Sequence, residues 1–194
     1  MQSLQTKGAV MHEYEWPRPM VTVDMILFRL PLVVDLSDQY QQFEVLMVKR
    51  LNDPFKGKWA LPGGYVNERE RVEVAARREC KEETSINCDQ LELTMVPTLF
   101  DHSTRDPRGW TISAAFFGVT NNYNLNPKAQ DDAAAAEFIP FTFKQLDEYS
   151  SDLAFDHRGV LLCAFNELAS KYTVNNLLRV AQGVAERRMS PVGL

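Results

Sequence analysis

Three glutamates stand at the spacing of one helical turn. Glu79, Glu82 and Glu83 occupy positions i, i+3 and i+4, and on an α-helix of about 3.6 residues per turn these positions share one face. Carboxylates in this arrangement repel one another, which destabilises a helix by roughly 0.2–0.5 kcal/mol per pair. A bound cation would offset the repulsion, and oxygen ligands of this kind favour Mg²⁺ or Mn²⁺. The spacing therefore predicts a divalent-metal site.

A glycine-rich turn and an amphipathic helix are expected to position these carboxylates. Pro62-Gly63-Gly64 predicts a tight turn shortly before the charged segment. Apolar residues recur in that segment at helical spacing, so one side of the helix is expected to pack on a core. They are Val72, Ala75, Ala76 and Cys80. A solvated surface helix with mixed charges is the alternative interpretation.

The order of fixed residues resembles the Nudix box, the signature of a family of hydrolases that act on nucleoside diphosphates linked to another moiety. The matching positions are Gly64, Glu70, Arg78, Glu79, Glu82, Glu83 and Ile86. The resemblance implies that Glu79 and Glu83 are the principal metal ligands. It implies Glu82 as an additional ligand or water contact, the Gly63 carbonyl as a further ligand, and Mg²⁺ or Mn²⁺ as the cofactor.

Two positions of this segment are expected to have structural roles. Glu70 is predicted to form an ion pair with Arg78 rather than to bind metal. Ser85 departs from the family pattern, which has glycine there, near the end of the helix where a left-handed residue is common. A left-handed serine costs about 1 kcal/mol, or the helix end shifts, but the carboxylates keep their places.

Two parts of the sequence offer a candidate for the general base, and the choice between them stays open. Glu82 lies in the box, whereas Asp131 and Asp132 precede the segment Ala133 to Phe138, where the resemblance implies an acidic loop near the metals. Two aspartates in a polar loop are also typical of a solvated surface. The catalytic candidates are therefore Glu82, Glu83 and Asp132.

Further segments resemble the ADP-ribose pyrophosphatase branch of the family. This branch includes the Nudix domains fused to nicotinamide-mononucleotide adenylyltransferases and the Nudix-type repressors of NAD metabolism. The resemblance covers roughly residues 20–170 and implies an α/β fold, the Nudix α/β/α sandwich with a mixed β-sheet. The matching pieces are Pro17-Arg18-Pro19, Val21 to Asp24, Gly57 to Gly64, Arg105 to Gly109 and Leu153 to His157.

The loop from Arg105 to Gly109 is the main candidate for binding substrate. Its composition predicts a hairpin turn, and its forked guanidiniums also suit phosphate oxygens. The resemblance places the loop near substrate, which makes Arg105, Asp106, Arg108 and Gly109 candidate contacts. Arg50, at the end of a predicted strand, is a further phosphate candidate.

Aromatic and histidine residues give weaker indications. Phe55 or Trp59 could stack on an adenine ring, but Trp59 is expected to be core and Phe55 is left open as a substrate contact. Asp156 precedes His157 where a helix is expected to begin, and capping of the helix is favoured over catalysis.

Hydrophobic patterning predicts strands at 20–28, 43–48, 91–99, 110–119 and 138–140, and helices at 143–149, from 156 onward and at 174–187. We expect an N-terminal arm at 1–19, a Nudix domain at 20–170 and a helical tail at 171–194 packed on it. Relatives in this branch are often dimers, so the resemblance implies a homodimer.

The composition limits the classes of partner and compartment. The chain has 194 residues, 45% hydrophobic and 24% charged, which suits one compact domain. A net charge of −5 without a strongly basic run does not predict binding to nucleic acid or to an anionic membrane. No apolar run is long enough for a membrane span, the N-terminus lacks a secretory pattern, and three scattered cysteines suit a reducing cytoplasm.

Three functions remain open at this point. The first is metal-dependent hydrolysis of ADP-ribose, or a related nucleoside diphosphate derivative, to AMP and ribose 5-phosphate, which the complete carboxylate set favours. The second is a non-catalytic regulator that senses ADP-ribose, for which the residues after the last expected helix of the domain are too few to form a winged helix. The third is a Nudix hydrolase of a nucleotide sugar or a (d)NTP.

Overall fold

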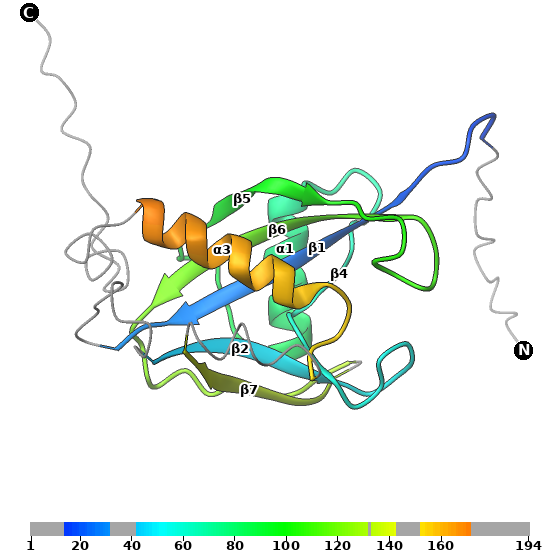
Figure 1. Ribbon diagram of the computed structural model, residues 1–194. Helices are drawn as coiled ribbons and strands as arrows, with labels where there is room; N and C mark the ends of the chain where they lie inside the picture. The colour runs from blue at the N-terminus through cyan, green and yellow to red at the C-terminus, as the bar shows by residue number, and fades with distance from the viewer. Residues whose placement is uncertain (1–13, 32–41, 132, 143–151, 172–194) are drawn as a thin grey trace, which may run out of the picture.

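The computed structural model describes residues 14–31, 42–131, 133–142 and 152–171 (Figure 1). Within them the chain forms seven strands and two helices. The strands are β1 (Met20–Arg29), β2 (Phe43–Arg50), β3 (Trp59–Ala60), β4 (Gly63–Tyr65), β5 (Thr94–Phe100), β6 (Thr111–Thr120) and β7 (Ala133–Phe141), and the helices are α1 (Val72–Thr84) and α3 (His157–Lys171). None of the described helices is long and apolar enough to cross a membrane.

The strands form one mixed sheet in which β1 is the central element. The order is β3-β2-β1-β6-β5, with β4 also paired to β1 and β7 also paired to β2. β1 and β6 run parallel over their whole length, and the other pairs are antiparallel. Phe28 and Arg29 of β1 pair with β2, whereas Thr22, Val23 and Asp24 pair with β4. One edge of β1 therefore pairs with β4 near its N-terminal end and with β2 near its C-terminal end.

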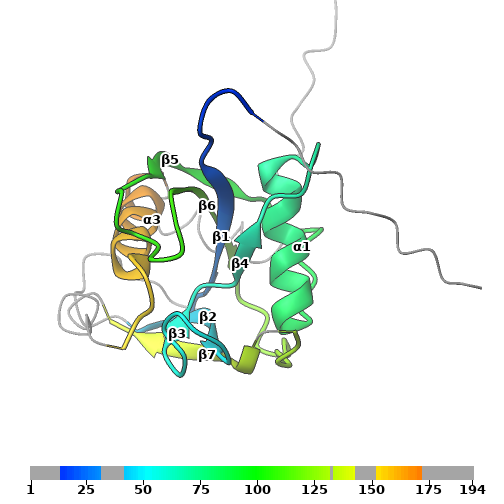
Figure 2. The ribbon, with the colours of Figure 1, turned by 90° about the vertical axis from the view of Figure 1, so that its right-hand side faces the viewer.

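The two helices cover opposite faces of the sheet, as Figure 2 shows. Side chains of a strand alternate between the faces, so Ile26 and Phe28 pack with Phe165 of α3, while Met25 and Leu27 pack with Ala76 of α1. The rings of Phe28 and Phe165 meet edge to face at 6.1 Å between centroids. Two separate hydrophobic clusters thus hold the sandwich together, one under each helix.

The α/β/α sandwich predicted from the sequence is confirmed. β1 and β2 extend the predicted strands by one and two residues, and β7 starts at Ala133 rather than at Phe138 because it pairs with β2 along its whole length. The short β3 and β4 were not predicted as strands. The predicted helices at 143–149 and 174–187 lie outside the described residues, as do 1–13 of the predicted arm and 172–194 of the predicted tail.

The C-terminal end of α1 has the left-handed residue expected there. Ser85 has φ 62° and ψ 6°, and its N–H donates to the Lys81 carbonyl. The carbonyls of Thr84 and Glu83 accept hydrogen bonds from the backbone N–H groups of Lys128 and Gln130, at 2.8 and 3.1 Å. The segment before β7 therefore satisfies carbonyls that an α-helix end leaves unpaired.

Replacing Ser85 with glycine should stabilise the protein. Glycine adopts a left-handed conformation without the steric cost that a Cβ imposes, which is about 1 kcal/mol. We expect Ser85→Gly to raise the free energy of unfolding in urea by about that amount. Ser85→Ala is the control, because alanine keeps the Cβ and loses the hydroxyl. Equal stability of the glycine and alanine variants would contradict this explanation.

Candidate active site

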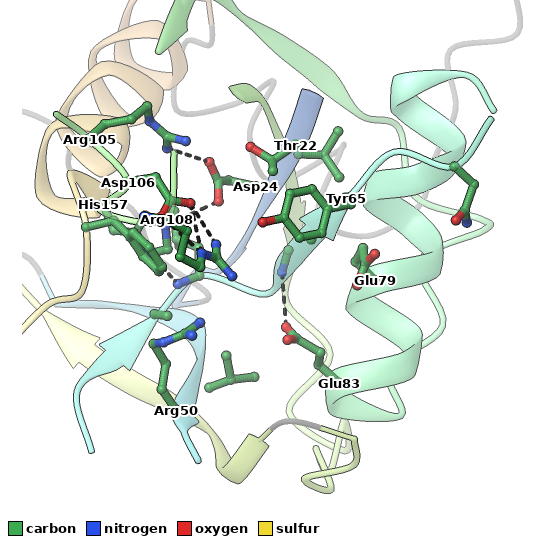
Figure 3. A pocket seen from close by; sticks show the side chains of 18 residues that line it. Thr22, Asp24, Arg50, Tyr65, Glu79, Glu83, Arg105, Asp106, Arg108 and His157 are labelled. Carbon is green, nitrogen blue, oxygen red and sulfur yellow. Dashed lines mark hydrogen bonds and ion pairs between the residues drawn. The ribbon is translucent and has the colours of Figure 1, made fainter. Parts of the chain in front are cut away.

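A pocket of about 280 Å³ lies where β1, β4 and α1 meet the loop at 105–109 and the start of α3. Figure 3 shows Glu79 and Glu83 projecting from α1 on one side, and Arg105, Asp106, Arg108 and His157 on the other. Carboxylates thus face guanidiniums across the cavity. A ligand that is anionic and also binds metal would suit this arrangement.

Two glycines let β4 pass between β1 and α1. A Cβ on Gly63 would lie 2.2 Å from the Val23 carbonyl oxygen, and one on Gly64 would lie 2.6 Å from the Glu79 carboxylate. A side chain at Gly63 would meet backbone, and one at Gly64 would displace the Glu79 carboxylate from its position. The Gly63 N–H donates to Glu83 Oε2 at 3.0 Å. The turn therefore lies in close contact with β1 and with the carboxylates of α1.

Arg78 holds three carboxylates around one guanidinium. It donates to both carboxylate oxygens of Glu70, at 2.8 and 2.9 Å, to Glu79 at 2.7 Å and to Glu82 at 2.8 Å. It also donates to the Tyr65 carbonyl at 3.0 Å. The predicted Glu70–Arg78 ion pair is confirmed, and it anchors the loop before α1 to the helix.

The electrostatics of Glu70 and Glu79 differ although both bind Arg78. The hydrogen bonds from Arg78 lower the pKa of Glu70 to about 2. Burial raises the pKa of Glu79 above its usual value, with the charges of Glu82 and Glu70 adding to the effect while Arg78 opposes it. The Glu79 carboxylate is thus disfavoured as an anion, and a nearby cation would relieve that cost.

The donor set fits a divalent cation. Glu79 and Glu83 both line the pocket beside Gly63, so two carboxylates and a backbone carbonyl are close together, all hard oxygen donors. The missing Cβ of Gly64 leaves room for the Glu79 carboxylate. Within residues 14–31, 42–131, 133–142 and 152–171, no three His, Cys, Asp or Glu side chains form a preformed metal cluster. Part of the coordination would therefore come from substrate and water, as Mg²⁺ commonly requires.

A protein-family model described as the NUDIX domain matches residues 31–161. The chain belongs to the Nudix family. It is 42% identical over 118 residues, 61% of this chain, to an ADP-ribose pyrophosphatase of Methanocaldococcus jannaschii, and 33% identical over 159 residues, 81% of this chain, to an ADPR responsive transcriptional repressor, NtrR, of Acinetobacter baylyi. The matches span 63% and 57% of those proteins, so the chain covers about three fifths of these relatives' length.

Solved structures of Nudix proteins have the same fold. A MutT/nudix family protein from Enterococcus faecalis superposes with a TM-score of 0.70 at 28% identity, covering 90% of this chain and 71% of that one. The NUDIX domain of Shewanella oneidensis NrtR complexed with ADP ribose gives 0.64 at 26% identity, covering 79% and 90%. A bifunctional NMN adenylyltransferase/ADP ribose pyrophosphatase from Francisella tularensis gives 0.63 at 26% identity, covering 79% and 42%.

The structure places some of the candidate metal ligands and general bases in the pocket and others outside it. Glu79, Glu83 and Gly63 line the pocket, whereas Glu82 does not and has a side chain 47% exposed and paired with Arg78. The metal roles of these residues stay predictions. Asp131 is exposed in the segment that contacts the end of α1, and Asp132 lies outside the described residues, so the choice of general base also stays open.

The substrate candidates of the 105–109 loop have different surroundings. Arg105 is almost fully buried, donates to both oxygens of Asp156 at 2.9 and 2.8 Å, and lies 3.4 Å from Asp24. Arg108 is more exposed and pairs with the buried Asp106 at 2.7 Å. Gly109 donates its N–H to the Asp106 carbonyl and does not line the pocket. Arg108 is therefore better placed than Arg105 to reach a ligand.

Aromatic rings surround the guanidiniums at the mouth of the pocket. The Arg108 guanidinium lies 5.4 Å from the Tyr65 ring centroid and 5.5 Å from that of Phe155, and Arg50 lies 5.0 Å from Phe155. Phe55 packs against Phe155 at 4.7 Å and does not line the pocket itself. Trp59 packs against the core, as predicted. The ring that faces the cavity is thus Phe155 rather than Phe55.

Several residues that line the pocket have no role predicted from the sequence. They are Thr22, Asp24, Tyr65, Asn67 and Phe155. Asp24 is buried between Ser113, at 2.6 Å, and His157, at 3.2 Å. Burial alone would raise its pKa, but His157, Arg105 and Ser113 outweigh that effect and lower it. Thr22, Asp24 and Phe155 lie in segments 21–24 and 153–157, whose resemblance to the family is the signal in the sequence that points to them.

Acid should weaken the Glu70–Arg78 pair in a defined pH window. Because the pKa of Glu70 is about 2 in the folded protein, against 4.5 for a free glutamate, its stabilising contribution is present above pH 4.5 and is lost as the pH falls toward 2. We expect Glu70→Gln to destabilise the protein at pH 6, with a difference from wild type that shrinks steadily on acidification. Urea unfolding across that range measures it, and Glu68→Gln, on an exposed side chain, is the control. A pH-independent difference would contradict the assignment.

Removing the Arg105 guanidinium should destabilise the fold. The buried Asp24 would lose one of its partners and Asp156 would lose both hydrogen bonds, and breaking one side of a buried ion pair costs about 3–5 kcal/mol. We expect Arg105→Ala to lower the free energy of unfolding by about 3 kcal/mol. Arg69→Ala, on a side chain 89% exposed, should change it by less than about 0.5 kcal/mol. A stable Arg105→Ala protein with only a raised KM would assign Arg105 to substrate instead.

Proposed function

We propose that the protein hydrolyses the diphosphate bond of ADP-ribose, or of a related nucleoside diphosphate derivative, to AMP and ribose 5-phosphate in a reaction that requires Mg²⁺ or Mn²⁺. The observation that carries the proposal is that Glu79 and Glu83 lie beside the Gly63 turn at one wall of a pocket whose opposite wall carries the guanidiniums of Arg105 and Arg108. The 42% identity to an ADP-ribose pyrophosphatase supports the same substrate.

Glu79, Glu83 and the Gly63 carbonyl would hold the metal. When bound, it would neutralise the diphosphate oxygens and lower the pKa of a water molecule. In the net reaction water adds to one phosphorus, the bridging P–O bond breaks, and the protons that remain are released to solvent. Glu83 is already fixed against the Gly63 N–H at 3.0 Å, so the chain supplies an oriented carboxylate before any ligand arrives.

The general base is proposed at Glu82 or Asp132. Glu82 is on the same helix as the metal ligands, but its carboxylate binds Arg78 at 2.8 Å and would have to leave that contact. Asp132 follows the segment whose backbone contacts the C-terminal end of α1. Single Glu82→Gln and Asp132→Asn variants discriminate between them, because only replacement of the true base should lower kcat strongly. The loss should be largest at pH values above the pKa of the base, where the base is deprotonated and active.

Substrate recognition is proposed for the cationic and aromatic wall. Arg108 and Arg50 would contact the phosphates or the ribose phosphate, and Tyr65 and Phe155 offer ring faces to a base or to a guanidinium. Thr22 Oγ1 is buried and has no hydrogen-bond partner among the described residues, although Thr22 lines the pocket. A ligand hydroxyl or a water molecule would satisfy it.

A second candidate function is a regulator that senses ADP-ribose without hydrolysing it. The 33% identity to an ADPR responsive transcriptional repressor over 81% of this chain favours it. The retained glutamates of the box favour the hydrolase, because binding alone does not need a row of carboxylates beside a diphosphate.

We further propose a homodimer located in the cytoplasm, with a small-molecule substrate and no nucleic-acid partner.

The two functions are separated by the products formed from a panel of nucleotides. ADP-ribose, ADP-glucose, NADH, diadenosine polyphosphates and dNTPs would be incubated with Mg²⁺ or Mn²⁺ and the products resolved by chromatography. AMP and ribose 5-phosphate from ADP-ribose, lost with chelator, is the expected result. Tight binding of ADP-ribose without turnover would favour the sensor, and faster turnover of a nucleotide sugar or a dNTP would change the assigned substrate.

Glu83→Gln should abolish metal-dependent turnover with little effect on folding. The amide oxygen of glutamine can still accept the Gly63 N–H, but the charge that would bind the cation is gone. We expect a loss of at least about 100-fold in kcat/KM and a change in the free energy of unfolding below about 1 kcal/mol. Glu73→Gln makes the same chemical change elsewhere on α1 and should keep full activity. Full activity of Glu83→Gln would remove Glu83 from the metal site.

A further inference from the structure

His157 links the start of α3 to the glycine turn. The residue is 3% exposed, and its Nδ1 accepts a hydrogen bond from the Leu61 backbone N–H at 2.9 Å. Its Nε2 lies 3.2 Å from Asp24 Oδ1. A backbone N–H can only donate, so Nδ1 is the unprotonated nitrogen and the proton is on Nε2, directed at Asp24. The two partners thus fix both the tautomer and the ring orientation.

This contact continues a short row of backbone hydrogen bonds between β3 and the segment that precedes α3. Trp59 forms a parallel bridge with Leu153, with hydrogen bonds from Trp59 N to the Asp152 carbonyl at 3.0 Å and from Ala154 N to the Trp59 carbonyl at 2.8 Å. The backbone pairing stops there, and the His157 side chain continues it at Leu61. The imidazole therefore accepts the hydrogen bond from the Leu61 N–H that the carbonyl of a neighbouring strand would otherwise accept.

Leu61 is the last residue before Gly63 with a backbone N–H, because Pro62 has none. The Pro62 carbonyl accepts from Met25 N at 2.8 Å, and the Gly63 N–H donates to Glu83 at 3.0 Å. Leu61, Pro62 and Gly63 are thus held by α3, β1 and α1 in succession. We therefore expect the direction of the Gly63 carbonyl relative to Glu83 to depend on these contacts.

Asp24 is held firmly enough to serve as the support for this histidine. Its side chain is 8% exposed, it accepts from Ser113 Oγ at 2.6 Å, and Arg105 Nη2 lies 3.4 Å away. Asp24 is also the residue of β1 that pairs directly with Gly63 of β4. Asp24 therefore lies directly beside the turn in the sheet and also contacts the histidine that binds Leu61.

We propose that His157 is a positioning residue for the metal site, which orients the Gly63 carbonyl and the Glu83 carboxylate through its hydrogen bond to Leu61. The inference rests on the proposed function, since it assigns a support to that same site. His157 needs no contact with substrate or metal to act in this way. Residues that support metal ligands in proteins commonly change metal affinity by about 10–100-fold when replaced.

Two amide substitutions separate the two hydrogen bonds of His157. In His157→Asn the side-chain oxygen is as many bonds from Cα as Nδ1 is, so the Leu61 N–H keeps an acceptor and the Asp24 contact is lost. In His157→Gln the amide nitrogen replaces Nε2, so the Asp24 contact is kept and Leu61 loses its acceptor. Val160→Ala is the control for stability, because Val160 is buried in the core under α3 and its aliphatic side chain makes no hydrogen bond to Leu61 or Asp24.

The primary measurement is Mn²⁺ affinity by electron paramagnetic resonance, with thermal unfolding and the metal dependence of ADP-ribose hydrolysis recorded for the same proteins. We expect His157→Gln to weaken Mn²⁺ binding by about tenfold or more and to raise the half-saturating metal concentration, with most of kcat recovered at saturating metal. His157→Asn should stay close to wild type. Val160→Ala should lower the melting temperature without changing Mn²⁺ affinity.

Wild-type affinity in His157→Gln, or equal losses in both amide variants that follow their melting temperatures, would overturn the inference. Nitrogen-15 spectra of the wild-type imidazole test it without a variant, since a protonated Nδ1 would also overturn it. The Mn²⁺ titration needs no substrate. A wild-type protein that binds Mn²⁺ but does not hydrolyse ADP-ribose would therefore contradict the proposed activity alone, and one that binds no Mn²⁺ would contradict both.

Discussion

The close approach of the Gly63-Gly64 turn to β1 and α1 is the constraint on which the rest of the site depends. Side chains at these two positions would collide with the Val23 carbonyl and with the Glu79 carboxylate. The turn is also held by hydrogen bonds from Gly63 to Glu83 and from Leu61 to His157. Because the turn cannot move away without losing both, the carboxylates of α1 face the pocket in a fixed position.

The pocket wall opposite α1 depends on balanced buried charge. Arg105 lies between Asp24 and Asp156, and Arg108 neutralises Asp106. Burial would raise the pKa of each of Asp24 and Asp106, but hydrogen bonds and ion pairs with their neighbours keep both pKa values below the usual one. The contacts of Arg105 hold the 105–109 loop against β1 and the residue before α3, whereas the Arg108–Asp106 pair lies within the loop at the pocket.

The parts of the site that could be predicted from the sequence are local along the chain. The spacing of Glu79 and Glu83 within α1 and the left-handed Ser85 are set by neighbours a few residues away. The partners of Arg105 are 81 and 51 residues distant in the sequence, so its guanidinium could be recognised as a phosphate ligand but not as a buried ion-pair residue. Phe155 lines the cavity and Phe55 packs against it with tilted rings, and only the fold decides which of the two faces the pocket.

We propose above that α1 and the Gly63-Gly64 turn together bind a divalent metal that also contacts the diphosphate of the substrate. The most direct measurement is a crystal structure with Mn²⁺ and an ADP-ribose analogue whose bridging oxygen is replaced by a methylene group, with the metal located by anomalous scattering. We expect an anomalous peak in contact with Glu79, Glu83 and the Gly63 carbonyl, with phosphate oxygens completing the coordination. The analogue bound in the pocket with no metal at these residues would contradict it.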